Sequence, residues 1–390
     1  MSERIWCTLG CLTVMLTLMS ACQEAAAPEA VPGDDPATPG VREPIWTFAT
    51  QGEIWSSPTV DKGVVYFGSD DHFLYAVEVD THELKWKFET GDIVRSRPAV
   101  AKGIVYITSD NNYLYAVNAR TGKLVWDFNL GDTFVPRLPV TESWDYMQSS
   151  PIVVDGIVYV GSASFTFYAL DARTGQERWN YDMQSWMRSS PAVADGIVYF
   201  GDWRGIIHAH DIETGQEVWS LNTFGAVVPS PAIVDGVVYI GSKFPCLFAL
   251  DAKTGEKLWC FEYPGSIPWV ESSAAVADGM VYVGSSDWFR VNAIDAKTGQ
   301  LVWYFTTKGD PWCSPAVSEG VVYIGATGGL FYALDARTGT ELWHTQTDEA
   351  LVTVDPLRFD GGVVSSPTVE DGVVYFGGLD GKLYAVSTAP

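Results

Sequence analysis

Large aromatic residues, glycines and prolines recur along this chain at a fixed spacing. Eight tyrosines are each followed about twenty residues later by a tryptophan, except that the last tyrosine has no such partner. A glycine stands three residues before each tyrosine, and eight residues before it stands a proline in seven units and Ala274 in the other. Such glycines are typical of tight hairpin turns, so each unit is predicted to open with two short antiparallel strands. The tyrosines are Tyr66, Tyr106, Tyr159, Tyr199, Tyr239, Tyr282, Tyr323 and Tyr375, and the tryptophans are Trp86, Trp126, Trp179, Trp219, Trp259, Trp303 and Trp343.

An alanine and a Thr-Gly pair mark the second half of the units. The alanine comes ten or eleven residues after each tyrosine, and a small residue fits where neighbouring sheets approach closely. Six units then read Thr-Gly before the strand that carries the tryptophan, whereas the first unit reads Thr81-His82. The sequence therefore predicts a third and a fourth strand in each unit, joined by a second turn.

One further tryptophan, Trp46, stands before the first unit in a segment that matches the tryptophan strands of later units. The last unit, which contains Tyr375, lacks a tryptophan strand of its own. A repeat array that takes its final strand from its own beginning forms a closed ring, and repeats of about 40 to 50 residues with several short strands indicate a β-propeller. We expect an all-β fold: a single eight-bladed β-propeller of four-stranded blades over residues 45–390, closed by the strand that contains Trp46.

The repeat resembles the PQQ-like, tryptophan-docking propeller repeat. Its signature Ala-x-Asp-x-x-Thr-Gly-x-x-x-Trp is present from Ala169 to Trp179, and the resemblance covers residues 46 to 387. The same repeat builds quinoprotein alcohol dehydrogenases and the BamB-like outer-membrane assembly lipoproteins, and the architecture is closer to the latter. The resemblance thus implies the fold strongly and the function weakly, because one fold carries many functions.

The N-terminal segment resembles a bacterial lipoprotein signal. Arg4 is followed by a largely apolar stretch from Ile5 to Leu18, and Leu18-Met19-Ser20-Ala21-Cys22 ends it with small residues before a cysteine. Such a segment is too short for a spanning helix and is normally removed. We therefore expect residues 1–21 to be a signal peptide and Cys22 to be lipidated. The alternative is an ordinary secretory signal that ends at Ala21.

Residues 22–44 are rich in Ala, Pro, Glu, Asp and Gly, and this composition predicts a disordered tether. The resemblance implies an exported protein that is lipid-anchored to the cell envelope. Its place would be the periplasmic face of the outer membrane in an organism with two membranes, and otherwise the outer face of the cell membrane. The formal net charge of −24 disfavours nucleic acid and anionic lipid surfaces as partners, and we expect a monomer.

Cys246 and Cys260 flank the predicted turn from Asp251 to Gly255 and could face each other across antiparallel strands. In an oxidising envelope they would form a disulfide, although ordinary buried thiols remain an alternative. Cys313 stands where most units carry Ser.

The long insertions all fall between a tryptophan and the next proline-bearing strand, after Trp126, Trp259 and Trp343. These connections lie on one rim of a propeller, together with the turns between second and third strands, so one face is elaborated. Loops on a rigid scaffold usually carry recognition, and Trp, Tyr and Arg are frequent hot-spot residues of interfaces. The candidates for partner binding on this face are Trp144, Tyr146, Trp203, Arg204, Trp288 and Arg290.

The residues three positions before the conserved proline position are expected at the entrance of the central channel. They include two tryptophans, two arginines and two other polar residues, and directly before the proline seven units carry Ser while the second carries Arg97. Arginine pairs with carboxylates and tryptophan stacks, so this set could hold a planar anionic ligand. In quinoprotein dehydrogenases the quinone lies at this channel mouth, so the resemblance implies PQQ as one ligand. The candidates are Trp55, Arg95, Gln148, Arg188, Glu271 and Trp312.

No catalytic signature accompanies these candidates. The chain has no adjacent cysteine pair, no Cys-x-x-Cys-His haem motif, no phosphate loop, no nucleophile elbow and no zinc spacing. His208 and His210 would share one face of a strand, but they replace the Tyr and the Leu or Val of other units, and no third ligand is evident. We therefore expect packing rather than a metal site.

Two functional classes remain. The first is a non-enzymatic envelope scaffold resembling BamB, without a cofactor, whose implied partner is a membrane-embedded barrel-assembly protein. The second is a PQQ-dependent quinoprotein dehydrogenase or a small-molecule sensor that uses the arginines and tryptophans of the channel mouth. A surface carbohydrate binder is a weaker third alternative, because exposed tryptophans also stack on sugars.

Overall fold

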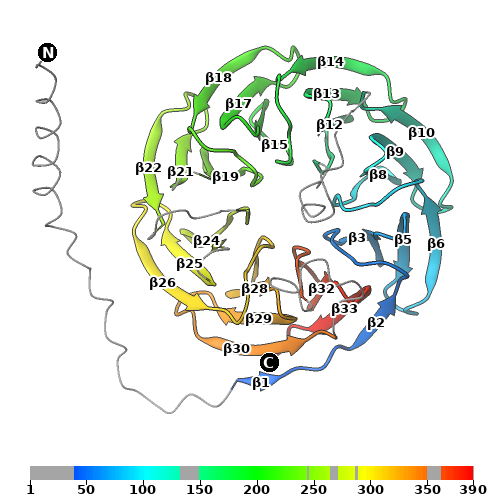
Figure 1. Ribbon diagram of the computed structural model, residues 1–390, viewed down its shortest axis with the longest axis vertical. Helices are drawn as coiled ribbons and strands as arrows, with labels where there is room; N and C mark the ends of the chain where they lie inside the picture. Colours follow the sequence, from blue (N-terminus) through cyan, green and yellow to red (C-terminus); the bar gives the residue numbers. More distant parts are fainter. Residues whose placement is uncertain are drawn as a thin grey trace, which may run out of the picture. The chain divides into compact units, whose positions relative to one another are not determined.

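The computed structural model describes residues 39–131, 149–243, 246–263, 271–285, 289–348 and 362–389, and all of their regular elements are β-strands. Eight sheets surround a common centre, as Figure 1 shows, and each contains four antiparallel strands that follow one another from the centre outward. The predicted eight-bladed propeller is therefore confirmed. Within the described ranges, no helix is present that could cross a membrane.

The first four blades each run from an innermost three-residue strand to a longer outermost strand. They contain β3 (Thr59–Asp61), β4 (Val64–Gly68), β5 (Phe73–Glu78) and β6 (Leu84–Glu89); β7 (Ala99–Ala101), β8 (Ile104–Ser109), β9 (Tyr113–Asn118) and β10 (Leu124–Asn129); β11 (Ile152–Val154), β12 (Ile157–Gly161), β13 (Thr166–Asp171) and β14 (Glu177–Asp182); and β15 (Ala192–Ala194), β16 (Ile197–Gly201), β17 (Ile206–Asp211) and β18 (Glu217–Asn222).

The remaining blades follow the same plan, with two strands supplied from the start of the chain. They contain β19 (Ala232–Val234), β20 (Val237–Gly241), β21 (Cys246–Asp251) and β22 (Lys257–Glu262); β23 (Ala275–Ala277), β24 (Met280–Ser285), β25 (Arg290–Asp295) and β26 (Leu301–Thr306); β27 (Ala316–Ser318), β28 (Val321–Gly325), β29 (Leu330–Asp335), β30 (Glu341–Gln346) and β1 (Gly40–Val41); and β31 (Thr368–Glu370), β32 (Val373–Gly377), β33 (Lys382–Ser387) and β2 (Trp46–Ala49).

The ring closes through β2. This strand pairs antiparallel with β33, and Trp46 lies opposite Ala385 in the ladder. Every other blade repeats the same pairing of a tryptophan with the third-strand alanine, for example Trp219 with Ala209. The closure expected from Trp46 is thus confirmed by the register of the strands.

A second closing strand, β1, was not expected from the sequence. Gly40 and Val41 pair in parallel with Trp343 and His344 of β30, so the seventh blade gains a fifth strand. These residues fall within the segment that the sequence assigned to the tether. A strand of two residues has no hydrophobic period, which is why composition alone did not indicate it.

Neighbouring blades are joined by a repeated contact between a tryptophan and the next blade. The indole of Trp219 donates a hydrogen bond of 2.8 Å to the carbonyl oxygen of Ala252, and the hydroxyl of Tyr199 donates one of 2.9 Å to the same oxygen. Gly255 of the next blade lies against the indole ring with a φ of +72°, and a Cβ atom there would come within 2.7 Å of the ring. Burial raises the pKa of Tyr199 to about 12, so this phenol stays a hydrogen-bond donor. The Tyr–Trp–Gly repeat of the sequence is therefore the contact that joins the blades.

Candidate functional site

The insertion-bearing rim forms what we call the upper face. Its described residues are found in the connections 50–58, 90–98, 149–151, 183–191, 223–231, 271–274, 307–315 and 362–367 and in the turns 69–72, 110–112, 162–165, 202–205, 242–243, 289, 326–329 and 378–381. Five sequence candidates, Cys22, Trp144, Tyr146, Gln148 and Trp288, lie outside the described residues. The other candidates separate into distinct groups, and they do not meet in one site.

The first group surrounds Trp55. This indole is 4% exposed, and its Nε1 donates a hydrogen bond of 2.8 Å to Glu53. The guanidinium of Arg95 lies 4.5 Å from the centroid of the Trp55 ring and pairs with both carboxylate oxygens of Asp70, the shortest contact being 2.6 Å. Burial alone would lower the pKa of Arg95, but its hydrogen bonds and the charge of Asp70 raise it. Trp312 packs against the same cluster. Trp55 and Arg95 are therefore already bound to each other and to two carboxylates.

The second group surrounds Trp203, in the turn between β16 and β17. The guanidinium of Arg188 lies 4.7 Å from the centroid of its ring, and the ammonium of Lys243 lies 4.3 Å from it. Lys243 also forms an ion pair of 3.8 Å with Glu271. Two cations on one indole make this part of the upper face basic, in a chain whose net charge is negative. Lys243 was not among the sequence candidates, because a single lysine in a turn carries no pattern.

Arg97 lies in the central channel. Its Nε donates a hydrogen bond of 3.2 Å to Thr59 and its Nη2 one of 3.1 Å to Thr368, so the side chain spans the innermost strands of three consecutive blades. No described carboxylate pairs with it. The side chain is accessible to solvent, but the protein around it on all sides partly desolvates the guanidinium and thereby lowers the pKa of Arg97. A guanidinium whose side-chain partners among the described residues are hydroxyl groups keeps its charge available for an anion.

The serines before the conserved prolines form a hydrogen-bonded chain around the same channel. Each backbone N–H donates to the hydroxyl of the equivalent serine in the next blade, as Ser150 does to Ser190 at 3.0 Å. The chain runs through Ser150, Ser190, Ser230, Ser273, Ser314, Ser366 and Ser57. It begins at the N–H of Arg97, which donates to Ser150, and it ends at Ser57, because Arg97 has no hydroxyl to accept the next bond.

An exposed aromatic array crosses the third and fourth blades. The ring centroids of Phe165 and Trp186 are 6.3 Å apart, and those of Trp186 and Trp203 are 6.4 Å apart. Phe165 and Trp186 are 42% and 44% exposed, and nearby Phe224 is 83% exposed. Among the described residues, every exposed Phe or Trp lies on the upper face or at its edge, at Phe165, Trp186, Phe224 and Phe289.

All three phenylalanines of this set adopt a left-handed backbone conformation. The φ angles of Phe165, Phe224 and Phe289 are +69°, +63° and +50°. Bulky residues rarely take this conformation, which costs roughly 1 to 2 kcal/mol and favours glycine or asparagine. Gly91 and Gly131 occupy the position of Phe224 in the first two blades. Phe165 stands where the fourth, seventh and eighth blades have Gly205, Gly329 and Gly381. Phe165 and Phe224 were not among the sequence candidates, and an aromatic residue at a glycine position was the signal that could have found them.

Of the two remaining candidates, Arg290 lies apart from these groups and Arg204 belongs with the group around Trp203. Arg290 stacks on Tyr304 of the outermost strand β26, with its guanidinium 4.1 Å from the ring centroid, so it faces the edge of the sixth blade. Arg204 is exposed beside Trp203, and its N–H donates to the Ser185 hydroxyl. Arg204 therefore adds a third basic side chain, after Arg188 and Lys243, next to the aromatic array.

The cysteines have structural positions. Cys246 in β21 and Cys260 in β22 form a cross-strand disulfide with Cα atoms 5.6 Å apart. The buried Cys313 accepts a hydrogen bond of 3.2 Å from the N–H of Gly325, as serine does at the equivalent place in other blades. Burial raises the pKa of the Cys313 thiol to about 12, so this thiol is protonated and unreactive.

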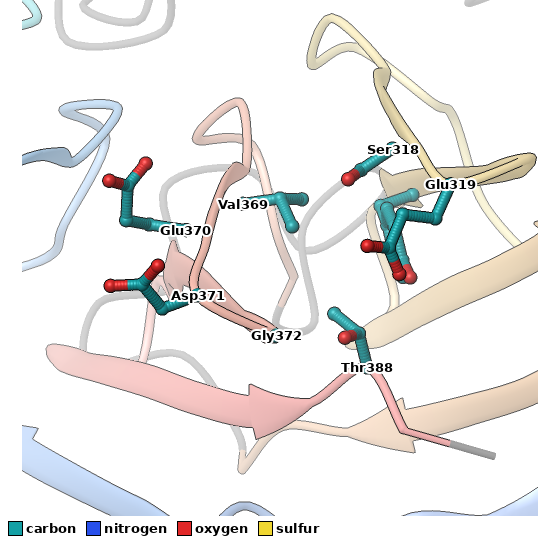
Figure 2. A pocket seen from close by; sticks show the side chains of 8 residues that line it. Ser318, Glu319, Val369, Glu370, Asp371, Gly372 and Thr388 are labelled. Atoms are coloured by element: carbon teal, nitrogen blue, oxygen red, sulfur yellow. The ribbon is translucent and has the colours of Figure 1, made fainter.

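One pocket lies on the opposite rim, between the seventh and eighth blades. Figure 2 shows the carboxylates of Glu319, Glu370 and Asp371 around it, with Thr388 below. Its lining contains no basic side chain. An anionic ligand is therefore repelled here, and the channel at Arg97 is the better place for one.

Eight four-stranded blades joined by tryptophan docking define a PQQ-like β-propeller. A family model described as outer membrane protein assembly factor BamB matches residues 41–134, 110–202, 203–312 and 289–389. The chain belongs to this family.

Individual relatives match over shorter stretches. A stretch of 111 residues is 34% identical to the quinohemoprotein alcohol dehydrogenase of Comamonas testosteroni, covering 24% of this chain and 16% of that protein. A stretch of 77 residues is 35% identical to outer membrane protein assembly factor BamB of Escherichia coli strain K12, covering 19% of each. The matches thus span less than a fifth of these relatives.

Solved structures extend the likeness over the whole ring. BamB from Moraxella catarrhalis superposes with a TM-score of 0.71 at 19% identity, covering 89% of this chain and 98% of that one. The quinohemoprotein alcohol dehydrogenase from Comamonas testosteroni superposes with a TM-score of 0.70 at 17% identity, covering 89% and 76%. At such identities the likeness shows the fold alone.

The dehydrogenase relatives raise the question of a quinone. Arg97 fits an anionic group, because no described carboxylate competes for it. Trp55 and Arg95 do not fit, because their stacking and hydrogen-bonding groups are used by each other, Glu53 and Asp70. The channel mouth therefore does not offer the ring of free Arg and Trp side chains that the sequence suggested for PQQ.

Proposed function

We propose that this protein is a non-enzymatic scaffold of the cell envelope that binds a partner protein through its upper face. The observation that carries the proposal is the aromatic array of the exposed Phe165 and Trp186 and the half-buried Trp203, with the exposed Phe224 in the adjoining connection. Two of these residues hold a strained left-handed backbone, and such strain persists only where the surroundings enforce it. An exposed phenylalanine in a strained backbone conformation destabilises the folded protein, but its ring can act as an anchor residue for a partner.

The chemistry of the surroundings suits a protein interface. Aromatic side chains and arginines dominate the binding energy of interfaces, and Arg188, Arg204 and Lys243 flank the array. A partner with acidic residues around an apolar surface would complement this basic and aromatic region in a chain that is otherwise acidic. The family match supports an outer-membrane assembly protein as that partner, as the name of the BamB relatives indicates.

The lipid anchor at Cys22 belongs to the same proposal. A lipidated N-terminus followed by the tether would hold the propeller at the membrane surface, on the periplasmic face of the outer membrane in an organism with two membranes. Lipidation would raise the local concentration of the upper face near a membrane-embedded barrel-assembly protein.

The test is a crosslinking pull-down of the protein from its native envelope. The variant Phe165→Gly/Trp186→Ser/Phe224→Gly should lose the partner that the native protein captures. A matched control, Leu258→Ser/Val302→Ser, removes exposed apolar residues from outermost strands and should retain it. Equal capture by all three proteins would refute the array as the interface. Globomycin-sensitive processing and labelling with a fatty acid, both lost in Cys22→Ser, would test the anchor separately.

Arg97 supports a second candidate function, which is the binding of a small anion or of PQQ in the channel. Titration with PQQ should then change the absorbance of the cofactor, and Arg97→Met should abolish the change. Oxidation of an alcohol or a sugar would have to accompany binding for the dehydrogenase class to hold. Binding without oxidation would leave a sensor, and no binding would remove both.

A further inference from the structure

Two histidines lie side by side on one face of β17. His208 is 4% exposed and His210 is fully buried, and their ring centroids are 5.9 Å apart. Nδ1 of His208 and Nε2 of His210 have no hydrogen-bond partner among the described residues. A buried polar atom without a partner costs about 1 to 3 kcal/mol, so these two nitrogens require an explanation.

The second nitrogen of each ring is held in place. Nε2 of His208 lies 3.3 Å from the carboxylate of Asp202, which is itself 1% exposed. Nδ1 of His210 lies 2.9 Å from the carbonyl oxygen of Gly215, and a carbonyl can only accept. In the neutral tautomer that these acceptors select, each ring has its hydrogen on the nitrogen that is already bonded and a lone pair on the nitrogen without a partner. Histidine ligands of metals are oriented by this same arrangement, a carboxylate or backbone carbonyl on the far nitrogen.

A third ligand comes from the neighbouring strand. Glu217 of β18 lies opposite His210 in the ladder, and one ligand atom from each of His208, His210 and Glu217 lies within 4.8 Å of the others. Ser220 donates a hydrogen bond of 3.0 Å to Oε1 of Glu217, which fixes the carboxylate on this face. The Glu217 side chain is exposed, so an ion could reach the site from the surface.

We propose that His208, His210 and Glu217 bind a divalent transition-metal ion, with Zn²⁺ as the first candidate. Two imidazoles and one carboxylate are common zinc ligands, and a fourth position is left for water. The ligand atoms of a tetrahedral zinc site lie about 3.4 Å apart. The three ligand atoms here lie within 4.8 Å of one another, so side-chain rotations would bring them to that spacing when the ion binds. The ion would join β17 to the outermost strand of the fourth blade.

Packing alone accounts for the rings but not for their nitrogens. Phe200 and Tyr181 contact the imidazoles, with centroid distances of 4.9 Å from Phe200 to His208 and 4.4 Å from Tyr181 to His210. In the third blade the same two positions hold Tyr168 and Leu170, and the position of His208 holds Tyr or Phe in every other blade except the sixth, which has the buried Asn292. At the position of His210 every other blade has Leu, Ile or Val, so this histidine adds a buried polar nitrogen where an aliphatic residue packs elsewhere.

The experiment measures zinc in untagged full-length protein. Elemental analysis after purification and dialysis should give one zinc per chain, and cobalt substitution should give the visible absorption of tetrahedral Co²⁺. Glu217→Gln should weaken zinc binding at least tenfold, and Asp202→Asn, which disturbs only the orientation of His208, by about 10- to 100-fold. The matched control is Glu177→Gln, because Glu177 holds the same strand position opposite Leu170 in the third blade.

A double variant protects the test against misfolding. His208→Tyr/His210→Leu gives the fourth blade the residues of the third and should fold, yet it should lose the zinc-dependent rise in melting temperature. Substoichiometric zinc in the native protein, or equal zinc affinity of Glu217→Gln and Glu177→Gln, would overturn the proposal. Binding that survives in the double variant would mean an adventitious ion elsewhere and would equally reject this site.

Discussion

The guanidinium of Arg42 lies 4.4 Å from the centroid of the Trp343 ring and donates a hydrogen bond of 2.7 Å to the carbonyl oxygen of Ser387. In six other blades a Thr-Gly turn of the next blade covers the docking tryptophan, and the eighth blade has no such turn. Arg42 and β1 therefore cover Trp343 where the repeat cannot, and they link the seventh blade to the eighth at the seam of the ring.

Removing this cover should weaken the seam. We expect Arg42→Ala to lower the free energy of unfolding by about 1 to 2 kcal/mol, because a partly buried cation–π contact and a hydrogen bond to Ser387 are both lost. Chemical denaturation measures the change. Arg120→Ala, on an exposed turn, is the control and should stay near zero; an equal loss in both variants would mean that Arg42 has no special role.

The docking contact between blades can be isolated with two glycines. Gly255 and Gly236 have φ angles of +72° and +76°, so alanine is strained at both, but only at Gly255 would the new Cβ meet the Trp219 ring. Gly255→Ala should therefore cost clearly more than Gly236→Ala in urea unfolding. Trp219→Ala should cost about 3 to 5 kcal/mol, since a large buried side chain is removed. Equal costs for the two glycine variants would contradict the docking contact.

The disulfide between Cys246 and Cys260 closes a short loop. Its reduction should lower the free energy of unfolding by about 3 kcal/mol, as loop-closure entropy predicts. Intact mass should rise by two hydrogens on reduction, and the double variant Cys246→Ser/Cys260→Ser should show the same loss without further change on adding reductant. The free thiol of Cys313 should resist alkylation until the chain unfolds. An unchanged mass would mean that the two cysteines are thiols.

Acid should destabilise the ring through its repeated Asp-x-x-Thr turns. The hydrogen bonds from Thr214, Thr254 and Thr298 lower the pKa of Asp211, Asp251 and Asp295, and those from Arg178 and Thr174 lower the pKa of Asp171 to about 2. A carboxylate with a lowered folded-state pKa stabilises the fold above its unfolded pKa of about 3.9, and the stabilisation is lost as pH falls toward about 2.

The second blade supplies the variant that tests this acid sensitivity. Asn118 stands in the same turn and accepts the same hydrogen bonds from Thr121 without an ionisable group. Asp211→Asn/Asp251→Asn/Asp295→Asn should therefore flatten the fall of the melting temperature between pH 4 and pH 2. A fall as steep as that of the native protein would assign acid unfolding to other groups.

The strained phenylalanines should show a separation of stability from binding. Phe224→Gly should leave the free energy of unfolding within about 1 kcal/mol of the native value, because relief of the left-handed strain offsets the entropy of a glycine in the unfolded chain. The same change should reduce capture of the envelope partner. Loss of partner together with a large loss of stability would instead make Phe224 a structural residue.

The sequence was sufficient for the fold because each blade repeats the same contacts. The same contact between blades requires Tyr, Ala, Gly and Trp at the same positions of the units. The spacing of these residues along the sequence therefore predicts the propeller directly. Pairings that depend on the ladder were not accessible in this way. Glu217 faces His210 only because a register shift between Ala209 and His210 displaces the outermost strand.

The channel-mouth residues illustrate a second limit. Trp55 and Arg95 occupy equivalent positions in adjacent units and stack on each other, but their availability to a ligand depends on Asp70, which lies in a turn 25 residues from Arg95. A contact between a side chain and a turn distant in sequence does not follow from the repeat spacing. The sequence therefore predicted more accessible Arg and Trp side chains at the channel mouth than the structure has.

The interrupted chain of serines around the channel has a consequence for orientation. If all eight blades were identical, a molecule bound in the channel could adopt eight equivalent rotational orientations about the propeller axis. Arg97 stands in the second blade where the other seven blades have serine, so one of the eight orientations differs from the rest. Arg97 thereby breaks the eightfold pseudo-symmetry of the ring, and a molecule whose anionic group pairs with it would bind in one rotational orientation about the propeller axis.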